Sequence, residues 1–325
     1  MRVPKFCLLV LMTPMILSCG QKSAGLQEGA VAPDVTLFEN GMKYMDKNQF
    51  IKARLAFQTL INTYPDSEYT PVSFLSIADS YYAEGGTENL LQAEAQYKDF
   101  IIFYPTHEMA DDAQMKVAAV NVRLMRAPDR DPTYARKAEV ELSKLLKDYP
   151  DSELSPTAKW ILREVEENLA TGIEKTANFY FDRHSYLASE SRYKEIVEKY
   201  ENYSKLDETL YRLGQSLERL GRVEEASVYY SRLASEYPFS DSFDKSKEKL
   251  ILLEKDVPPV NEEAARRNES NRRTDSFSIL DPIRSVWRVF SGAPDPYEIA
   301  KREAEQRRNG TQVPQQGSNG GNGGH

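Results

Sequence analysis

A turn signal that begins with tyrosine recurs five times along the chain and constrains its fold more than any other feature. Proline follows the tyrosine in four of the five copies, which are Tyr64-Pro65-Asp66, Tyr104-Pro105-Thr106, Tyr149-Pro150-Asp151, Tyr200-Glu201-Asn202 and Tyr237-Pro238-Phe239. Successive copies are 40, 45, 51 and 37 residues apart. Spacings of this order indicate repeated structural units that stack on one another.

An apolar stripe precedes each copy at the same offsets. Small residues stand twelve positions before the second residue of the signal, and they are Ala53, Ala93, Ala138, Ser189 and Ala226. Bulky residues stand eight and five positions before it, and they are Phe57, Tyr97, Leu142, Tyr193 and Tyr230, then Leu60, Phe100, Leu145, Ile196 and Leu233. These offsets lie on one face of an α-helix, and the proline cannot continue it. We therefore expect five helices that each bury one face and end at the tyrosine.

A partner helix is expected upstream of each of these helices. Gly41 stands twelve residues before Ala53, and Gly214 stands twelve residues before Ala226. Apolar residues flank both glycines at helical spacing. Because the distance between packed helices depends on the side chains at their contact, this pattern predicts that small residues face small residues where the helices cross.

The resulting helix pairs resemble the tetratricopeptide repeat, a helix-turn-helix unit of about 34 residues that stacks into a superhelix. The resemblance implies an all-α fold, a tetratricopeptide-repeat-like solenoid of about five helical hairpins over residues 34–254. The extra length is expected in a loop at 129–132 in the third unit and in a long first helix, about 155–184, in the fourth. An irregular helical bundle with coincidental spacing is the alternative.

The N-terminus carries a short apolar segment that ends at Cys19. Arg2 and Lys5 precede an apolar run over 6–17, and Ile16-Leu17-Ser18-Cys19 follows. This resembles a bacterial lipoprotein signal, so residues 1–18 are expected to be removed and the Cys19 thiol to receive lipid. A plain secretory peptide and a membrane anchor are the alternatives, although the run is shorter than the roughly 20 residues that cross a bilayer. Residues 19–33 are expected to form a flexible tether.

The composition changes again after residue 254. The charged run 262–273 and the terminal tract rich in Gly, Asn and Gln are expected to bury too little apolar surface to become ordered. Residues 255–325 are therefore predicted to be a largely disordered tail. Within it, the segment 276–291 is amphipathic and is expected to dock on its own domain, on a partner or on a membrane surface.

Charge and residue usage argue against several classes of function. The net charge of −8 becomes −10 when Arg2 and Lys5 are removed, and nucleic acid favours basic surfaces, so no nucleic-acid partner is expected. Cys7 is the only other cysteine, and the three histidines, His107, His184 and His325, lack ligand spacing. We therefore expect no catalysis, no metal site and no cofactor. A lipid-anchored hydrolase with a carboxylate pair is the alternative from another class.

Three stretches carry a narrower resemblance. They are Phe100 to His107 with Asp112-Ala113, Asp129-Arg130-Asp131-Pro132 leading into Tyr149-Pro150-Asp151-Ser152, and Leu169 to Arg192. Together with the five repeats and Cys19 they resemble the BamD family, the repeat lipoproteins of the outer-membrane β-barrel assembly machinery. The resemblance covers about 34–250.

This resemblance implies a non-catalytic scaffold anchored by lipid at the periplasmic face of the outer membrane. It would bind the periplasmic domains of the barrel-forming subunit, accessory lipoproteins and unfolded β-barrel proteins. Tyr64 matches a tyrosine of the substrate site in the early repeats, and Arg192 matches an arginine that faces the barrel subunit. Each also has a structural interpretation, because Tyr64 belongs to the repeat's packing register and Arg192 can pair with a nearby Glu. A periplasmic repeat adaptor for cell-division or peptidoglycan enzymes is the alternative function.

Overall fold

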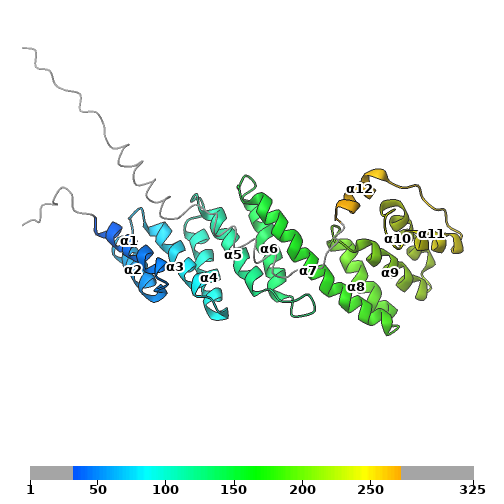
Figure 1. Cartoon of the computed structure of the whole chain (residues 1–325), viewed down its shortest axis with the longest axis horizontal. Helices are drawn as coiled ribbons and strands as arrows, with labels where there is room; N and C mark the ends of the chain where they lie inside the picture. Colours follow the sequence, from blue (N-terminus) through cyan, green and yellow to red (C-terminus); the bar gives the residue numbers. More distant parts are fainter. Residues whose placement is uncertain (1–31, 272–325) are drawn as a thin grey trace, which may run out of the picture.

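The computed structural model describes residues 32–271, and all regular structure in this range is helical (Figure 1). Its helices are α1 (Pro33–Asp46), α2 (Phe50–Thr63), α3 (Thr70–Glu84), α4 (Thr87–Phe103), α5 (Ala110–Leu124), α6 (Thr133–Asp148), α7 (Ser155–Asp182), α8 (Tyr186–Lys199), α9 (Leu206–Arg219), α10 (Val223–Glu236), α11 (Phe243–Leu252) and α12 (Glu262–Asn271). The predicted all-α fold is confirmed.

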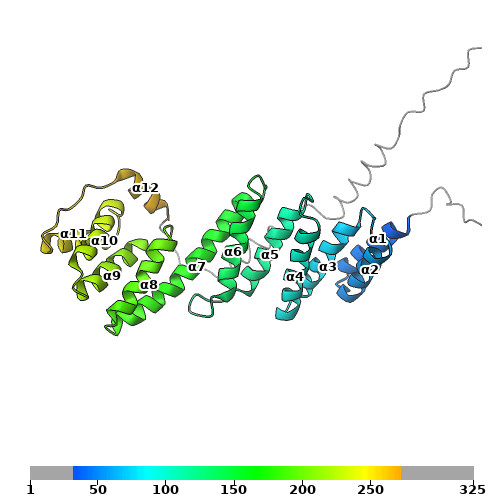
Figure 2. The ribbon, with the colours of Figure 1, turned by 180° about the vertical axis from the view of Figure 1, so that it is seen from behind.

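The helices form five successive hairpins, α1–α2 through α9–α10, followed by α11. Each helix packs on its hairpin partner, and the second helix of each hairpin also packs on the first helix of the next. The array is elongated, with α1 at one end and α11 near the other, as both views show (Figures 1 and 2). This is the stacking predicted for a tetratricopeptide-repeat-like solenoid.

The five signal tyrosines adopt one backbone conformation. Each follows the second helix of a hairpin, with φ between −131° and −125° and ψ between 56° and 63°. Each donates its N–H to the carbonyl four residues earlier and accepts, on its own carbonyl, the N–H three residues later. The same turn therefore joins every hairpin to the next helix, and the predicted repeat register is confirmed.

The predicted stripe is the core of the solenoid. All fifteen stripe residues have no solvent-exposed surface. Three aromatic members, Tyr97, Tyr193 and Tyr230, also bind the preceding helix through their hydroxyls, donating to Asp79, Asn178 and Glu218 respectively. A tyrosine in the stripe thus contributes its ring to the apolar core, and its hydroxyl finds a hydrogen-bond partner on the neighbouring helix.

The contacts of the two helical glycines differ from the prediction. A side chain on Gly41 would overlap the ring of Phe57, and one on Gly214 would overlap the ring of Tyr230. The prediction that small residues face small residues is wrong at these two crossings. Gly41 leaves space for the ring of Phe57, one turn after Ala53, and Gly214 leaves space for the ring of Tyr230, one turn after Ala226. An aromatic ring extends farther from its own helix than an alanine methyl group does, so it needs a glycine opposite it.

The third and fourth hairpins carry the extra length that the sequence predicted. α7 has 28 residues, twice the length of α8, and the segment 125–132 forms an irregular connection before α6. The carbonyl of Pro128 lies against Gly172 of α7, so closely that no side chain would fit there. Among the described residues, no helix is both long and apolar enough to cross a lipid bilayer.

The start of the tail differs from the expectation of disorder. Residues 262–271 form α12, whose buried residues are Ala264, Ala265 and Asn268. The prediction of disorder rested on the lack of large apolar side chains in this segment. α12 instead contacts the solenoid through two alanines and amide hydrogen bonds. The predicted signal peptide 1–18, Cys19, nearly all of the tether and the amphipathic segment 276–291 lie outside the described residues.

Candidate partner-binding surfaces

Tyr64 lies in the turn between α2 and α3 and is half-buried. Its N–H donates to the Leu60 carbonyl at 2.8 Å, and its carbonyl accepts the Ser67 N–H at 3.0 Å and the Thr70 hydroxyl at 2.9 Å. The backbone of Tyr64 thus has the structural role that the repeat register predicts. Its side chain remains partly accessible beside that turn.

An aromatic surface lies at the next equivalent turn, formed by Phe74, Phe103 and Tyr104. The Phe74 ring centroid is 6.0 Å from that of Phe103 and 5.8 Å from that of Tyr104, and the Phe103 residue is 63 % exposed. His107 packs its ring against Tyr104 and accepts the Met109 N–H on Nδ1. His107 thus has a structural role in the turn before α5, and partial burial lowers its pKa.

Arg192 lies on α8 and forms an ion pair within that helix. Its Nη1 is 3.1 Å from Glu195 Oε2, and Lys199 binds the other carboxylate oxygen of Glu195 at 3.1 Å. Burial raises the pKa of Glu195, but the hydrogen bonds from Lys199 and Arg192 outweigh it and leave that pKa below its usual value. Arg192 therefore pairs with a nearby glutamate, as its structural interpretation predicted. Half of its side chain is still exposed, so the guanidinium can also bind a partner's carboxylate.

The structure does not bring Tyr64 and Arg192 together. Tyr64 ends the first hairpin and Arg192 belongs to the fourth, with two hairpins stacked between them (Figure 1). Any roles in binding must therefore concern two separate surfaces.

A polar groove of about 540 Å³ lies between α9 and the start of α11. Residues of both charges line it, including Lys205, Glu208, Arg212 and Lys245. Gln215 also lines it, and its buried Oε1 has no hydrogen-bond partner in the described part of the chain. Spacing alone did not identify this groove, because its two walls come from different repeats.

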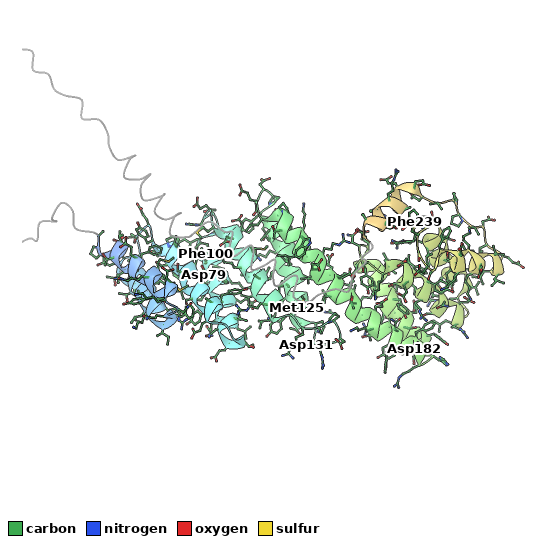
Figure 3. The ribbon with its side chains drawn as sticks, viewed as in Figure 1. Asp79, Phe100, Met125, Asp131, Asp182 and Phe239 are labelled. Atoms are coloured by element: carbon green, nitrogen blue, oxygen red, sulfur yellow. The ribbon has the colours of Figure 1, made fainter. Side chains whose placement is uncertain are left out.

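A buried ionic cluster joins the second and third hairpins. Lys116 of α5 pairs with Asp112 one turn earlier, at 3.1 Å, and with Asp79 of α3, at 3.0 Å; Figure 3 labels Asp79. Burial alone would lower the pKa of Lys116, but the two carboxylates raise it above its usual value. Burial raises the pKa of Asp112, and Lys116 opposes that effect. This is a paired structural cluster, which the sequence analysis missed.

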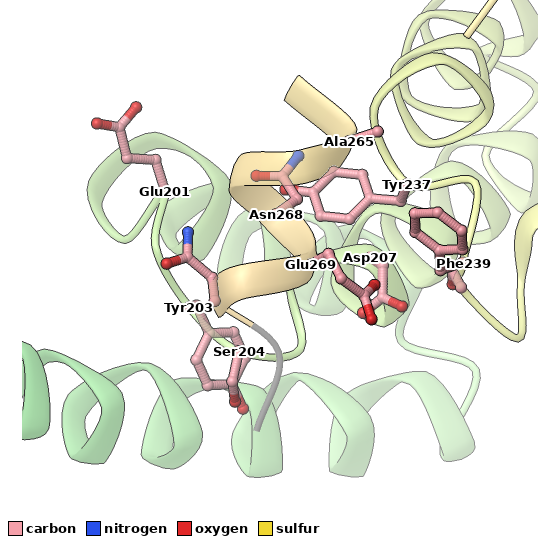
Figure 4. Close-up of a pocket in the computed structure, with 11 residues that line it drawn as sticks. Glu201, Tyr203, Ser204, Asp207, Tyr237, Phe239, Ala265, Asn268 and Glu269 are labelled. Atoms are coloured by element: carbon pink, nitrogen blue, oxygen red, sulfur yellow. The ribbon is translucent and has the colours of Figure 1, made fainter. Parts of the chain in front are cut away.

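The end of the described chain packs along the last repeats. α12 covers the turn before α9 and the turn before α11, with a pocket of about 20 Å³ left beneath it. Asn268 lies beside the Tyr237 ring at this pocket (Figure 4). No group of three or more His, Cys, Asp or Glu side chains suited to a metal ion occurs within residues 32–271.

The comparison with family models places this architecture in a known group. The model described as YfiO, outer membrane lipoprotein, matches residues 31–230, which is more than half of the chain. The chain belongs to the YfiO family. The match begins just before α1 and ends within α10, so it includes every hairpin except the end of the last.

Proteins similar to this YfiO family member include two named outer membrane protein assembly factor BamD. The one from Rickettsia prowazekii is 25 % identical over 245 residues, covering 74 % of this chain and 94 % of that protein. The one from Neisseria meningitidis serogroup A is 22 % identical over 214 residues, covering 63 % of this chain and 79 % of that protein. The BamD resemblance read from the residues is thus confirmed.

Among solved structures, the complex of the TPR2AB domain of yeast Sti1 with pHSP90 is similar to this chain. The match covers 84 % of this chain and 96 % of that one, at 14 % identity and a TM-score of 0.34. This score is too low to add to the description of the fold.

Proposed function

We propose that the chain is a BamD-type assembly factor, a scaffold that helps β-barrel proteins enter the outer membrane. The observation that carries this proposal is the YfiO family match over residues 31–230. The relatives named as assembly factors align along most of their own length, which supports the same role for the whole solenoid.

The anchor in this proposal is the lipidated thiol of Cys19. It holds the solenoid at the periplasmic face of the outer membrane through the tether 19–33. The order of elements supports this arrangement, since α1 begins at Pro33 and leaves only 13 residues between Cys19 and the domain. A stretch of this length spans at most about 50 Å when extended.

The binding roles are divided between the early hairpins and the fourth hairpin. Arg192 on the fourth hairpin offers its exposed guanidinium to an acidic group on a periplasmic domain of the barrel-forming subunit. Tyr64, with the aromatic surface of Phe74, Phe103 and Tyr104 at the next turn, receives the apolar strands of unfolded β-barrel proteins. Accessory lipoproteins complete the assembly.

The scaffold acts without catalysis and without a cofactor in this proposal. The ionic cluster of Lys116 with Asp79 and Asp112 is mostly shielded from solvent and internally paired, which favours a structural role over chemistry.

Co-purification tests the proposal. The lipidated, affinity-tagged chain should be isolated from solubilised envelopes of its own cells and the bound proteins identified by mass spectrometry. Recovery of a large outer-membrane β-barrel protein with periplasmic domains is expected. Recovery of peptidoglycan or cell-division enzymes in its place would support the adaptor function instead.

A further inference from the structure

The polar groove between α9 and α11 has a cation on each of its walls. On the α9 wall, the guanidinium of Arg212 stacks over the ring of Phe181, 4.9 Å from the ring centroid. On the α11 wall, Lys245 is exposed to solvent. Neither cation forms an ion pair within residues 32–271. The groove therefore offers two positive charges that no carboxylate of the described chain neutralises.

An ion pair further along the two helices fixes the relative position of these walls. Lys249 of α11 binds Glu218 of α9, with 2.8 Å between Nζ and Oε1. The turns before both helices also line the groove, so α9 and α11 run in the same direction. Lys245 lies one turn before Lys249, and Gln215 lies one turn before Glu218. The ammonium of Lys245 is therefore expected to lie at the level of Gln215, opposite the α9 wall.

The side chain of Gln215 adds an amide to the cationic part of the groove. Gln215 follows Arg212 by about one turn on α9, so both side chains lie on the same face of that helix. The Oε1 atom of Gln215 is buried and has no hydrogen-bond partner in the described part of the chain. An unpaired buried acceptor is costly, so a ligand that donates an N–H group to Gln215 is favoured. The amide also has two donors, which complement a peptide carbonyl.

The opposite end of the groove carries the opposite charge. Asp207, Glu208 and Asp241 line that end, and Lys205 beside them lies 3.9 Å from a carboxylate oxygen of Glu174. Asp207 also lines the pocket beneath α12 (Figure 4), so the acidic end is the one next to α12. The groove is thus polarised along its length. Charge complementarity places an anionic group of a ligand at the far end, beside Arg212 and not beside Asp207.

The size and lining of the groove suit a polypeptide. Its volume of about 540 Å³ falls within the range of about 300–1,000 Å³ that is usual for ligand sites. Side chains with hydrogen-bonding groups make up the lining, in contrast to the aromatic surface of Phe74, Phe103 and Tyr104. An extended segment leaves its peptide N–H and C=O groups unpaired, and such a lining can bind them.

We propose that this groove binds an extended polypeptide segment through an acidic side chain. The carboxylate of that side chain lies between Arg212 and Lys245, and the adjoining peptide group bonds with the amide of Gln215. The planar guanidinium of Arg212, held against Phe181, offers two parallel N–H donors to the carboxylate. This site involves neither Tyr64 nor the guanidinium of Arg192, so it stands apart from the proposed assembly role.

Fluorescence anisotropy tests the preference for an acidic segment. The probe is a labelled decapeptide of serine and threonine with two adjacent glutamates at its centre, titrated with the full mature chain at physiological ionic strength. We expect saturable binding that weakens several-fold when the glutamates are replaced by glutamines and further when they are replaced by lysines. A lack of saturable binding, or equal affinities for the glutamate and glutamine peptides, would overturn the proposal.

A pair of variants on α11 tests the location. Lys245→Gln should weaken binding of the glutamate peptide several-fold, with an unchanged thermal unfolding midpoint, because Lys245 is exposed. Lys247→Gln is the matched control, since Lys247 lies on the same helix, pairs with Asp244 and does not line the groove. Equal affinities of the two variants for the peptide would place the contact elsewhere and contradict the proposal.

Carbodiimide coupling identifies the contact directly. The reagent joins a peptide carboxylate to a lysine amine as an amide and takes up the released water as a urea. Mass spectrometry of the digested product should find the glutamate peptide attached to Lys245 and not to Lys247. Lys245→Arg should retain binding but lose this adduct, because arginine keeps the charge without a reactive amine. Adducts spread evenly over the exposed lysines would contradict a contact at Lys245.

Discussion

Lys116 of α5 and Asp79 of α3 form a buried ion pair that joins two successive hairpins, with 3.0 Å between Nζ and Oδ1. The hydroxyl of Tyr97 binds the same Asp79 oxygen at 2.6 Å, so three helices meet at one carboxylate. The junction between the second and third hairpins is thus specified by charge as well as by apolar contact.

Removing the ammonium from this junction should destabilise the fold strongly. Lys116→Ala removes a buried ammonium and leaves the partly buried carboxylates of Asp79 and Asp112 without their cation, and breaking such a pair typically costs up to about 3–5 kcal/mol. Urea unfolding followed by circular dichroism measures this loss. Lys175→Ala is the matched control, since Lys175 pairs with Asp129 at a site where both side chains are more than half exposed, and the substitution should cost about 1 kcal/mol or less. Equal losses for the two variants would contradict the role assigned to Lys116.

The helix crossing at Ala93 tests the packing register. Ala93 has no exposed surface, so Ala93→Phe must displace its neighbours and should cost about 1–3 kcal/mol. Leu91→Phe, two residues earlier at a position that is 39 % exposed, should be nearly neutral. The two thermal unfolding midpoints provide the comparison, and a neutral Ala93→Phe would invalidate the register.

The raised pKa of Glu166 should make the free energy of unfolding depend on pH. Burial, followed by the charge of Glu139, raises its pKa to about 6 from the ordinary 4.5. The folded state therefore binds a proton on Glu166 more tightly than the unfolded state does. This difference stabilises the folded state below pH 4.5, and the stabilisation is lost as pH rises through about 6. Glu166→Gln should therefore stabilise the protein at pH 7.5, by about 1 kcal/mol or less at this partly solvated site, and have little effect at pH 4.

Urea unfolding at both pH values measures this difference. Glu248→Gln, at an exposed position on α11, is the control. A stabilisation by Glu166→Gln of equal size at the two pH values would mean that titration of this carboxyl is not its source.

The anchor is tested by Cys19→Ala. The substitution removes the only thiol left after cleavage, so the chain should move from the membrane fraction to the soluble fraction of the envelope. Its helical circular dichroism should not change, because Cys19 lies outside the solenoid. Retention in the membrane fraction after a high-salt wash would rule out the lipid tether as the main attachment.

Arg192→Glu tests the proposed contact with the barrel-forming subunit. The variant places a negative charge where a partner carboxylate is expected, and recovery of that subunit should fall several-fold. Lys199→Glu is the matched control, because Lys199 also binds Glu195 on the exposed side of α8. If both substitutions reduce recovery equally, general charge and not the guanidinium explains the effect.

Much of the fold follows from local sequence patterns. The five tyrosine turns and the stripe before each of them predicted the hairpins, the long α7 and the fifteen fully buried residues. These features were predictable because helical periodicity and turn chemistry act over a few residues.

Other features depend on contacts between distant segments, and the tertiary structure alone decides them. The ionic cluster has no local signature, and neither do the rings that fill the space at Gly41 and Gly214. α12 is the clearest case, since its ten mostly polar residues are held on the solenoid by buried Ala264 and Ala265 and by hydrogen bonds with Arg163, Asn202 and Glu236. The sequence determined the repeating unit through short-range periodicity, whereas stacking decided which polar groups meet, because burial and pairing between repeats depend on three-dimensional proximity.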